Sequence, residues 1–283
     1  MSADMEPNYQ DPAKEPTYRS STKSIPSYRS VLKPEKKGFG LPGSFLKFFA
    51  LIMMTAYDFA VVIIQNGKLY GYSELYYHMA IATEEGQWWL RLHDALIITG
   101  QFSFPFFAYL LVEGFIHTSD FWKYFRRVLI FALLSEVPYD LCFFNETYDL
   151  TRQNPMFTLA IGLLCMYFMQ QFHRRSILKW FSVAVCCALA YAVKSDFGLF
   201  GVLGIALMYN FRKEKTLRIL SGIATTALLS LDLYGIGALC YLLILLYNGD
   251  RGHLSMKWFY YLYYPLHLTV FYLMIYIGAT LTA

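Results

Sequence analysis

The sequence predicts an all-α protein built as a polytopic transmembrane helical bundle. Hydrophobic residues make up 57% of the 283 residues and charged residues only 16%. The apolar residues also occur in long runs that short charged connections separate. Soluble proteins average about 45–50% apolar and about 25% charged residues. The composition therefore excludes an ordinary soluble domain and makes the lipid bilayer the expected partner.

The apolar runs set the expected helices. A helix needs about 20 residues to cross about 30 Å of hydrocarbon. Several runs are shorter, so we expect them to be tilted, broken or packed behind longer neighbours. Roughly nine helices (about eight to ten) are expected, from the runs 45–64, 92–116, 125–144, 156–172, 180–193, 197–211, 217–231, 234–247 and 258–280.

Residues 1–44 differ in composition from the rest of the chain. They hold six of the ten prolines, seven basic and five acidic residues, and few apolar residues with which to build a core. Such a segment cannot offset the entropy lost on ordering. We expect a disordered cytoplasmic tail over 1–44 and a single transmembrane helical domain over 45–283.

The basic residues predict the orientation in the membrane. With nine helices, twelve basic residues fall in connections on the same side as the tail, and four fall on the other side. Because basic residues are enriched in cytoplasmic connections, we expect a multi-pass protein of the cytoplasmic membrane with its N-terminus inside and its C-terminus outside. The four on the outer side are Lys68, Arg91, Arg152 and Lys194.

Polar residues within the apolar runs are the candidate site. A rise of 1.5 Å per residue places Asp58, Glu136 and His267 at similar depths, with Gln101 in the same zone and Asp140 one turn from Glu136. Ionisable groups inside a bilayer are costly and often functional, so we expect them to face one another. The alternative is that they are interhelical hydrogen bonds without a chemical role.

Three prolines accompany these polar residues. Each proline frees a backbone carbonyl and bends its helix. Broken helices beside buried polar groups favour a water-accessible cavity, whereas ordinary kinks are the alternative reading. The three are Pro105, Pro138 and Pro265.

Several sequence blocks resemble one family. Residues 104–115 read FPFFAYLLVEGF, followed by HT at 117–118 and SEVPYDL at 135–141. NPMFTL at 154–159, DFGLFGV at 196–202 and KWFYYLYYPLHL at 257–268 follow in order. In this order the blocks resemble the TraX family of membrane acetyltransferases, over essentially the whole chain after the tail.

The resemblance implies an activity and a substrate class. It implies transfer of acetyl from cytoplasmic acetyl-CoA, the co-substrate, to an amine or a hydroxyl. Because the family includes conjugation proteins that acetylate F-type pilin, it also implies a pilin or another envelope substrate. Relatives carry Asp-His and Gly-Arg pairs where this chain has Asp58-Phe59 and Gly100-Gln101. His93, at the expected outer end of the second helix, is therefore a second candidate histidine.

Acetyl transfer needs a base that titrates near neutral pH and a stabiliser for the oxyanion. Histidine suits the first role, and a carboxylate orients it. We assign His267 as base or transient acetyl acceptor, Glu136 or Asp58 as its partner, and Gln101 as candidate oxyanion donor.

Basic residues in the inner connections are candidates for the coenzyme phosphates. Arginine binds phosphate through paired N–H groups. The enrichment of basic residues in cytoplasmic connections also explains them without any ligand. The candidates are Arg126, Arg127, Arg174 and Arg175.

Two other classes of function fit the same features. Buried carboxylates and broken helices also occur in transporters, and the departures from the family pattern fit a non-catalytic partner in pilus or envelope assembly. No nucleic-acid module is present in the sequence, and the five cysteines have no zinc-like spacing. Glu113 and His117 are expected at the cytoplasmic end of their helix, away from the central site.

Overall fold

A computed structural model describes residues 40–250, 252 and 257–282. Most of the predicted tail, residues 1–39, lies outside the described residues. Within them the regular structure is helical, with two isolated β-bridges. The main helices are α1 (Gly43–Asp58), α3 (Glu84–Gly100), α4 (Ser103–Ile116), α5 (Phe121–Phe143), α6 (Pro155–Gln171), α7 (Ser176–Ala192), α8 (Gly198–Asn210), α9 (Lys215–Leu229) and α11 (Lys257–Thr282).

The first predicted helix is longer than expected, and its second part is a π-helix rather than an α-helix. Directly after Asp58 the chain continues as a π-helix, η2 (Phe59–Lys68). Together they form one stretch, Gly43–Lys68, that is long and apolar enough to cross a membrane. π-helical turns are rare and often occur at functional sites. The change of type therefore draws attention to Asp58.

The second predicted helix, 92–116, is wrong as a single element. It starts earlier, at Glu84, and is interrupted at Gln101 and Phe102 between α3 and α4. Pro105 has no N–H to donate to the carbonyl of Gln101, four residues earlier, so the regular ladder cannot continue there. Taken through this break, Glu84–Ile116 is the second stretch in the described residues that passes the length and apolarity test for a membrane span.

Two other segments depart from the expected helices. Residues 234–247 form a short 3₁₀ helix, η4 (Ile236–Cys240), followed by α10 (Tyr241–Leu245), rather than one spanning helix. Tyr234 and Gly235 both have positive φ, 56° and 73°, so the chain must turn before this segment. A further 3₁₀ turn, η3 (Leu231–Leu233), precedes it, and a short helix not expected from the sequence, α2 (Glu74–Ile81), lies in the connection before α3.

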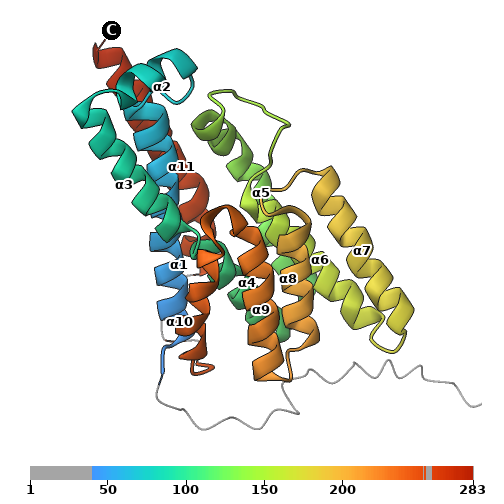
Figure 1. The fold of residues 1–283 in the computed structure, drawn as a ribbon. Coiled ribbons are helices and arrows are strands. Elements are labelled where there is room, and N and C mark those ends of the chain that lie inside the picture. Colours follow the sequence, from blue (N-terminus) through green and yellow to red (C-terminus); the bar gives the residue numbers. More distant parts are fainter. Residues whose placement is uncertain (1–39, 251, 253–256, 283) are drawn as a thin grey trace, which may run out of the picture. The chain divides into compact units, whose positions relative to one another are not determined.

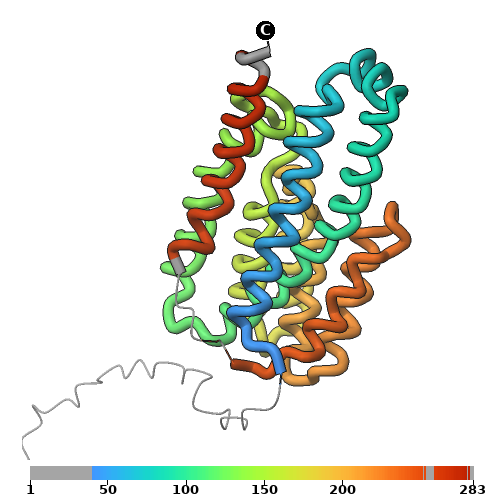
Figure 2. The backbone as a smooth tube through the Cα atoms, turned by 90° about the vertical axis from the view of Figure 1, so that its left-hand side faces the viewer, coloured from blue at the N-terminus to red at the C-terminus, as the bar shows by residue number. Residues whose placement is uncertain are grey.

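The helices pack in two connected groups. In Figure 1, η2, α2 and α3 lie in the upper part of the view, and α4, α8, α9 and α10 lie lower. α11 packs on α5 and η2, while α6 links α5 to α7 and α8. Figure 2 shows that α1 with η2 and α11 run in the same direction along this unit.

The connections gather at two ends of the helical unit. Those at 117–120, 172–175 and 211–214 lie toward the end at which α1 begins, and those at 69–83, 144–154 and 193–197 lie toward the opposite end (Figure 1). Successive connections therefore lie at alternate ends, as the assignment of basic residues to two sides of the membrane assumed. The placement of each end relative to a membrane stays a prediction.

The outward faces of several helices are apolar. On α7, Ile177, Phe181 and Val185 are exposed, and α5 exposes Ile130 and Leu133. Large exposed apolar patches on a protein mark an interaction with another protein or a membrane. Apolar and aromatic side chains fill the interior, including Ala132, Phe106, Tyr139, Leu163, Ile205 and Tyr241.

Candidate active site

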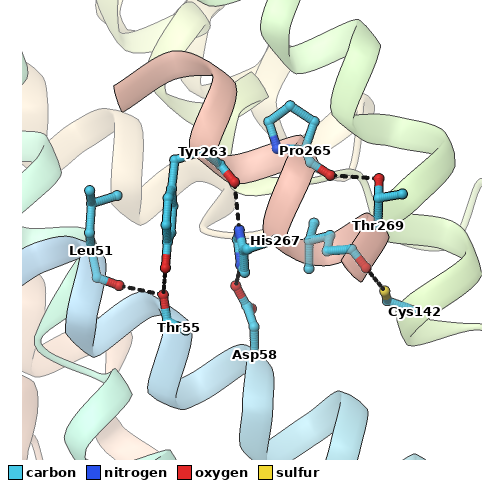
Figure 3. A network of polar contacts seen from close by, with 9 residues as sticks. Leu51, Thr55, Asp58, Cys142, Tyr263, Pro265, His267 and Thr269 are labelled. Atoms are coloured by element: carbon cyan, nitrogen blue, oxygen red, sulfur yellow. Dashed lines mark hydrogen bonds and ion pairs between the residues drawn. The ribbon is translucent and has the colours of Figure 1, made fainter. Parts of the chain in front are cut away.

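The central feature of the site is a buried contact between Asp58 and His267. Asp58 is the last residue of α1 and His267 lies within α11, 209 positions later. The imidazole Nε2 is 2.7 Å from Asp58 Oδ2, and the two residues are only 8% and 4% exposed. Figure 3 shows the two side chains pointing toward each other from the two helices. The predicted meeting of Asp58 and His267 is thus present in the structure.

Neighbouring groups hold the imidazole in place. His267 Nδ1 lies 2.9 Å from the carbonyl oxygen of Tyr263, one turn earlier in α11. The Tyr263 ring stacks on the imidazole with centroids 5.0 Å apart. The Thr55 hydroxyl donates to the Leu51 carbonyl at 2.8 Å, so the Tyr263 hydroxyl, 2.7 Å away, donates to Thr55. A chain of contacts therefore joins α1 to α11 beside the pair (Figure 3).

The hydrogen bonds of His267 determine how many protons the pair holds. A carbonyl oxygen only accepts, so the contact with Tyr263 places a proton on Nδ1. The contact between Nε2 and Asp58 Oδ2 needs a second proton, carried by one atom or the other. Both contacts are hydrogen bonds at the same time when the pair carries one proton more than a neutral imidazole beside an ionised carboxylate. Asp58 and His267 share this proton in a buried position.

Glu136 has a different partner from the one the sequence suggested. Its Oε2 accepts a hydrogen bond from Asn154 Nδ2, and its Oε1 is buried without a partner among the described residues. Asn154 also donates to the Ala132 carbonyl at 2.8 Å, and its Oδ1 accepts from Met156 N at the start of α6. Among the described interactions, Glu136 therefore serves the junction of α5 and α6, and Asp58 is the partner of His267.

The remaining candidates from the sequence lie apart from the pair. Asp140 is fully buried, and its Oδ2 accepts from the backbone N–H of Asp149 at 3.0 Å, which ties down the connection after α5. Gln101 lies in the break between α3 and α4. No described hydrogen bond links either residue to Asp58 or His267.

His93 is not at the outer end of its helix, as the sequence suggested. α3 begins at Glu84, nine positions earlier, because Thr83 caps the helix by accepting from Gly86 N at 3.0 Å. His93 Nδ1 lies 2.9 Å from Oδ1 of the adjacent Asp94, and its Nε2 is buried without a partner among the described residues. This second Asp–His pair is more exposed than the central one, since the Asp94 side chain is 64% exposed.

The four candidate phosphate-binding arginines lie on two different segments, α5 and the α6–α7 connection. Arg126 and Arg127 donate through Nε to carbonyls of their own helix, those of Trp122 and Lys123. Arg174 and Arg175 are exposed in the α6–α7 connection. Their proposed role in binding the coenzyme stays a prediction.

Two further residues join the polar region, and the sequence reading had not selected them. Arg152 Nε lies 3.5 Å from Asp196 Oδ1, where residues 153 and 195 form a β-bridge. Burial raises the pKa of Asp196 to about 6, with Arg152 lowering it and Asp58 raising it further. The sequence could have pointed to Asp196, because this residue is the first of the family-like block at 196–202.

The fold and the site together define a class: an all-helical protein with apolar helices of spanning length and a buried carboxylate–imidazole pair between α1 and α11. The chain belongs to the TraX protein family, which matches residues 42–275. A similar protein from Dichelobacter nodosus, named as a probable fimbrial assembly protein FimC, serogroup H1, is 29% identical over 219 residues. That match covers 66% of this chain and 84% of the relative. No solved structure matches the chain.

Proposed function

We propose that this chain is an integral membrane acetyltransferase that moves acetyl from acetyl-CoA to an amine or a hydroxyl. The observation that carries the proposal is the buried Asp58–His267 pair with its shared proton. Acetyl transfer must remove one proton from the acceptor and supply one to the leaving sulfur. A buried pair that can both give and take a proton suits this requirement.

Each atom of the pair has a distinct part in the proposal. The Tyr263 carbonyl holds the Nδ1 proton, so only Nε2 is left to exchange protons. Asp58 Oδ2 faces that nitrogen and stabilises its charged form. The pair can give its shared proton to the leaving sulfur and take one from the acceptor, which leaves its own proton count unchanged. Acetyl-CoA supplies the activated thioester.

The membrane setting rests on the exposed apolar faces and the two apolar stretches of spanning length. We place the end at which α1 begins in the cytoplasm, because the connections at that end carry most of the basic residues. A reporter fused after Ala283 should then read as extracytoplasmic, and one inserted within 212–218 as cytoplasmic. The opposite result at either position would contradict the proposed orientation.

The acceptor is proposed from the relative's name. Since the similar protein is named for fimbrial assembly, we propose that this chain also acts in fimbrial or pilus assembly, on a pilin or another envelope protein. The departures Phe59 and Gln101 leave the Asp58–His267 pair intact.

The deciding experiment is incubation of the purified protein with acetyl-labelled acetyl-CoA, with and without amine and hydroxyl acceptors. An acetyltransferase should transfer label to one acceptor class, or release acetate slowly when no acceptor is present. A transporter or a non-catalytic assembly partner would do neither. Absence of both transfer and hydrolysis, in protein that is folded and binds coenzyme A, would contradict the proposed activity.

A further inference from the structure

Arg218 in the first turns of α9 is a buried cation with one side left unpaired. The residue is only 6% exposed. Its Nη1 donates to Glu113 Oε1 at 2.6 Å, from the last turn of α4. Its Nε and Nη2 are both buried and have no partner among the described residues. Buried donors without partners are uncommon in folded proteins, so this side of the guanidinium needs an explanation.

The two unpaired atoms form one recognition edge. In a planar guanidinium, the Nε–H and one Nη2–H point in parallel on the same side, and they match two oxygens of a single carboxylate or phosphate. Glu113 occupies the Nη1 side and leaves this edge free. Leaving two such donors buried and unpaired costs free energy, whereas one bound oxyanion would satisfy both.

The surroundings fix the orientation of this edge. The guanidinium carbon lies 4.1 Å from the centroid of the Tyr109 ring, in a cation–π contact, and Tyr109 is itself buried. Glu113 binds one side of the guanidinium and Tyr109 covers one face, so the Nε–Nη2 edge is already oriented for a ligand. Preorganised donors bind more tightly because less conformational freedom is lost.

The position of the edge indicates the kind of oxyanion. Arg218 follows the α8–α9 connection, which carries the exposed Lys213 and lies toward the end at which α1 begins (Figure 1). Exposed Lys215 opens α9. Exposed Glu214 lies between the two lysines and offsets one of them. Because Glu113 neutralises Arg218, the net local charge is the remaining positive charge of this connection. A multiply charged phosphate gains more from these lysines than a single carboxylate does.

We propose that the Nε–Nη2 edge of Arg218 binds a phosphate group of the acetyl donor. This identity of the ligand rests on the proposed function; the oxyanion site itself rests on the unpaired edge. The site differs from the arginines first considered, because Arg126 and Arg127 use their Nε on their own helix and Arg174 and Arg175 are exposed. Arg218 alone among these five combines burial with an unpaired edge.

The first test is the affinity for coenzyme A, measured by titration calorimetry on the full chain in maltoside detergent and phosphate-free buffer. Arg218→Lys keeps the positive charge but lacks the two parallel N–H donors. The dissociation constant for coenzyme A should therefore rise by about tenfold or more. The double variant Glu113→Gln/Arg218→Gln should show the same loss while avoiding an unpaired buried carboxylate. Lys68→Gln, an exposed control at the end of η2 and at the opposite end of the helical unit, should change the affinity by less than about threefold.

Further measurements separate the sources of phosphate. Inorganic phosphate should compete with coenzyme A in the parent protein and in Lys68→Gln. Mass spectrometry of the intact purified protein should show the same retained phosphatidylglycerol in the parent and in Arg218→Lys. Loss of that lipid with unchanged coenzyme A binding would assign the edge to a lipid headgroup and overturn our proposal. Unchanged coenzyme A affinity in both Arg218 variants, with folding verified by thermal unfolding, would overturn it as well.

Failure of the proposed phosphate site can be distinguished from failure of the proposed acetyltransferase activity. If coenzyme A binds through Arg218 but no acetyl is transferred or hydrolysed, the activity is wrong and the phosphate site stands. If acetyl transfer occurs and Arg218→Lys leaves both the KM for acetyl-CoA and the coenzyme A affinity unchanged, the phosphate site is wrong and the activity stands.

Discussion

Asp58→Asn is expected to lower the rate of acetyl transfer by roughly 100- to 10,000-fold, the usual range for loss of a proton-transfer group. Asparagine keeps the size of the aspartate and one acceptor oxygen, so it preserves the packing between α1 and α11. It cannot hold the proton that Asp58 shares with His267. His267→Gln should cause a loss of similar size, because it removes the ring that exchanges the proton.

The double variant gives the sharper result. If the two residues act as one unit, Asp58→Asn/His267→Gln should be about as impaired as either single variant, because effects within a unit are not additive. Initial rates with labelled acetyl-CoA at saturating acceptor provide the measurement. Asp232→Asn makes the same change at an exposed carboxylate in η3 and should leave the rate near that of the parent. A fully active Asp58→Asn would refute the assignment.

Glu136→Gln tests the other partner suggested for His267. Glutamine can still accept the hydrogen bond from Asn154 that ties α5 to α6, so folding should be retained. A loss as large as that of Asp58→Asn would show that Glu136 shares in proton transfer, and near-normal activity would restrict it to the helix junction.

Gly100→Ala is expected to destabilise the protein by about 1–3 kcal/mol, the usual cost of adding a methyl group to a tightly packed contact. A methyl group at Gly100 would lie 2.4 Å from the Cβ of Tyr57. Because a Cβ cannot rotate away, α3 and α1 would have to separate. Tyr57 immediately precedes Asp58, so the carboxylate would move relative to His267, and acetyl transfer should fall along with stability.

The matched control for this prediction is Gly278→Ala in α11, where a new methyl group meets no atom of the described residues within 4 Å. Denaturation in detergent, followed by tryptophan fluorescence, should show an earlier midpoint for Gly100→Ala and no loss for Gly278→Ala. Equal midpoints for the two variants would mean that the close approach of α1 and α3 does not hold in the folded protein.

The meeting of Asp58 and His267 was predictable because depth along a helix follows directly from residue count. Each residue advances about 1.5 Å along the axis, so residues far apart in the sequence can be matched by level. Depth does not reveal which helices are neighbours or which way a side chain points. The sequence therefore left both Glu136 and Asp58 as partners for His267, and the structure directs Glu136 to Asn154 instead.

The interruptions of the helices were harder to predict. Pro105 indicated a bend but did not show that α3 and α4 would be separate elements. The change to η2 after Asp58 has no signal in the sequence that we recognise. From the sequence alone, Arg218 is one of the twelve basic residues expected on the same side as the tail. Its pairing with Glu113 depends on α4 and α9 lying side by side, which local sequence patterns do not encode.

The acceptor that orients His267 is a main-chain oxygen, and this affects which changes the chain can tolerate during evolution. Any amino acid at position 263 supplies the same carbonyl, so no single codon change there can remove the hydrogen bond to Nδ1. The Tyr263 side chain can therefore be replaced while the main-chain carbonyl still fixes the tautomer of the imidazole. In a saturation library, position 263 should accept many replacements, whereas positions 58 and 267 should each retain essentially one residue type.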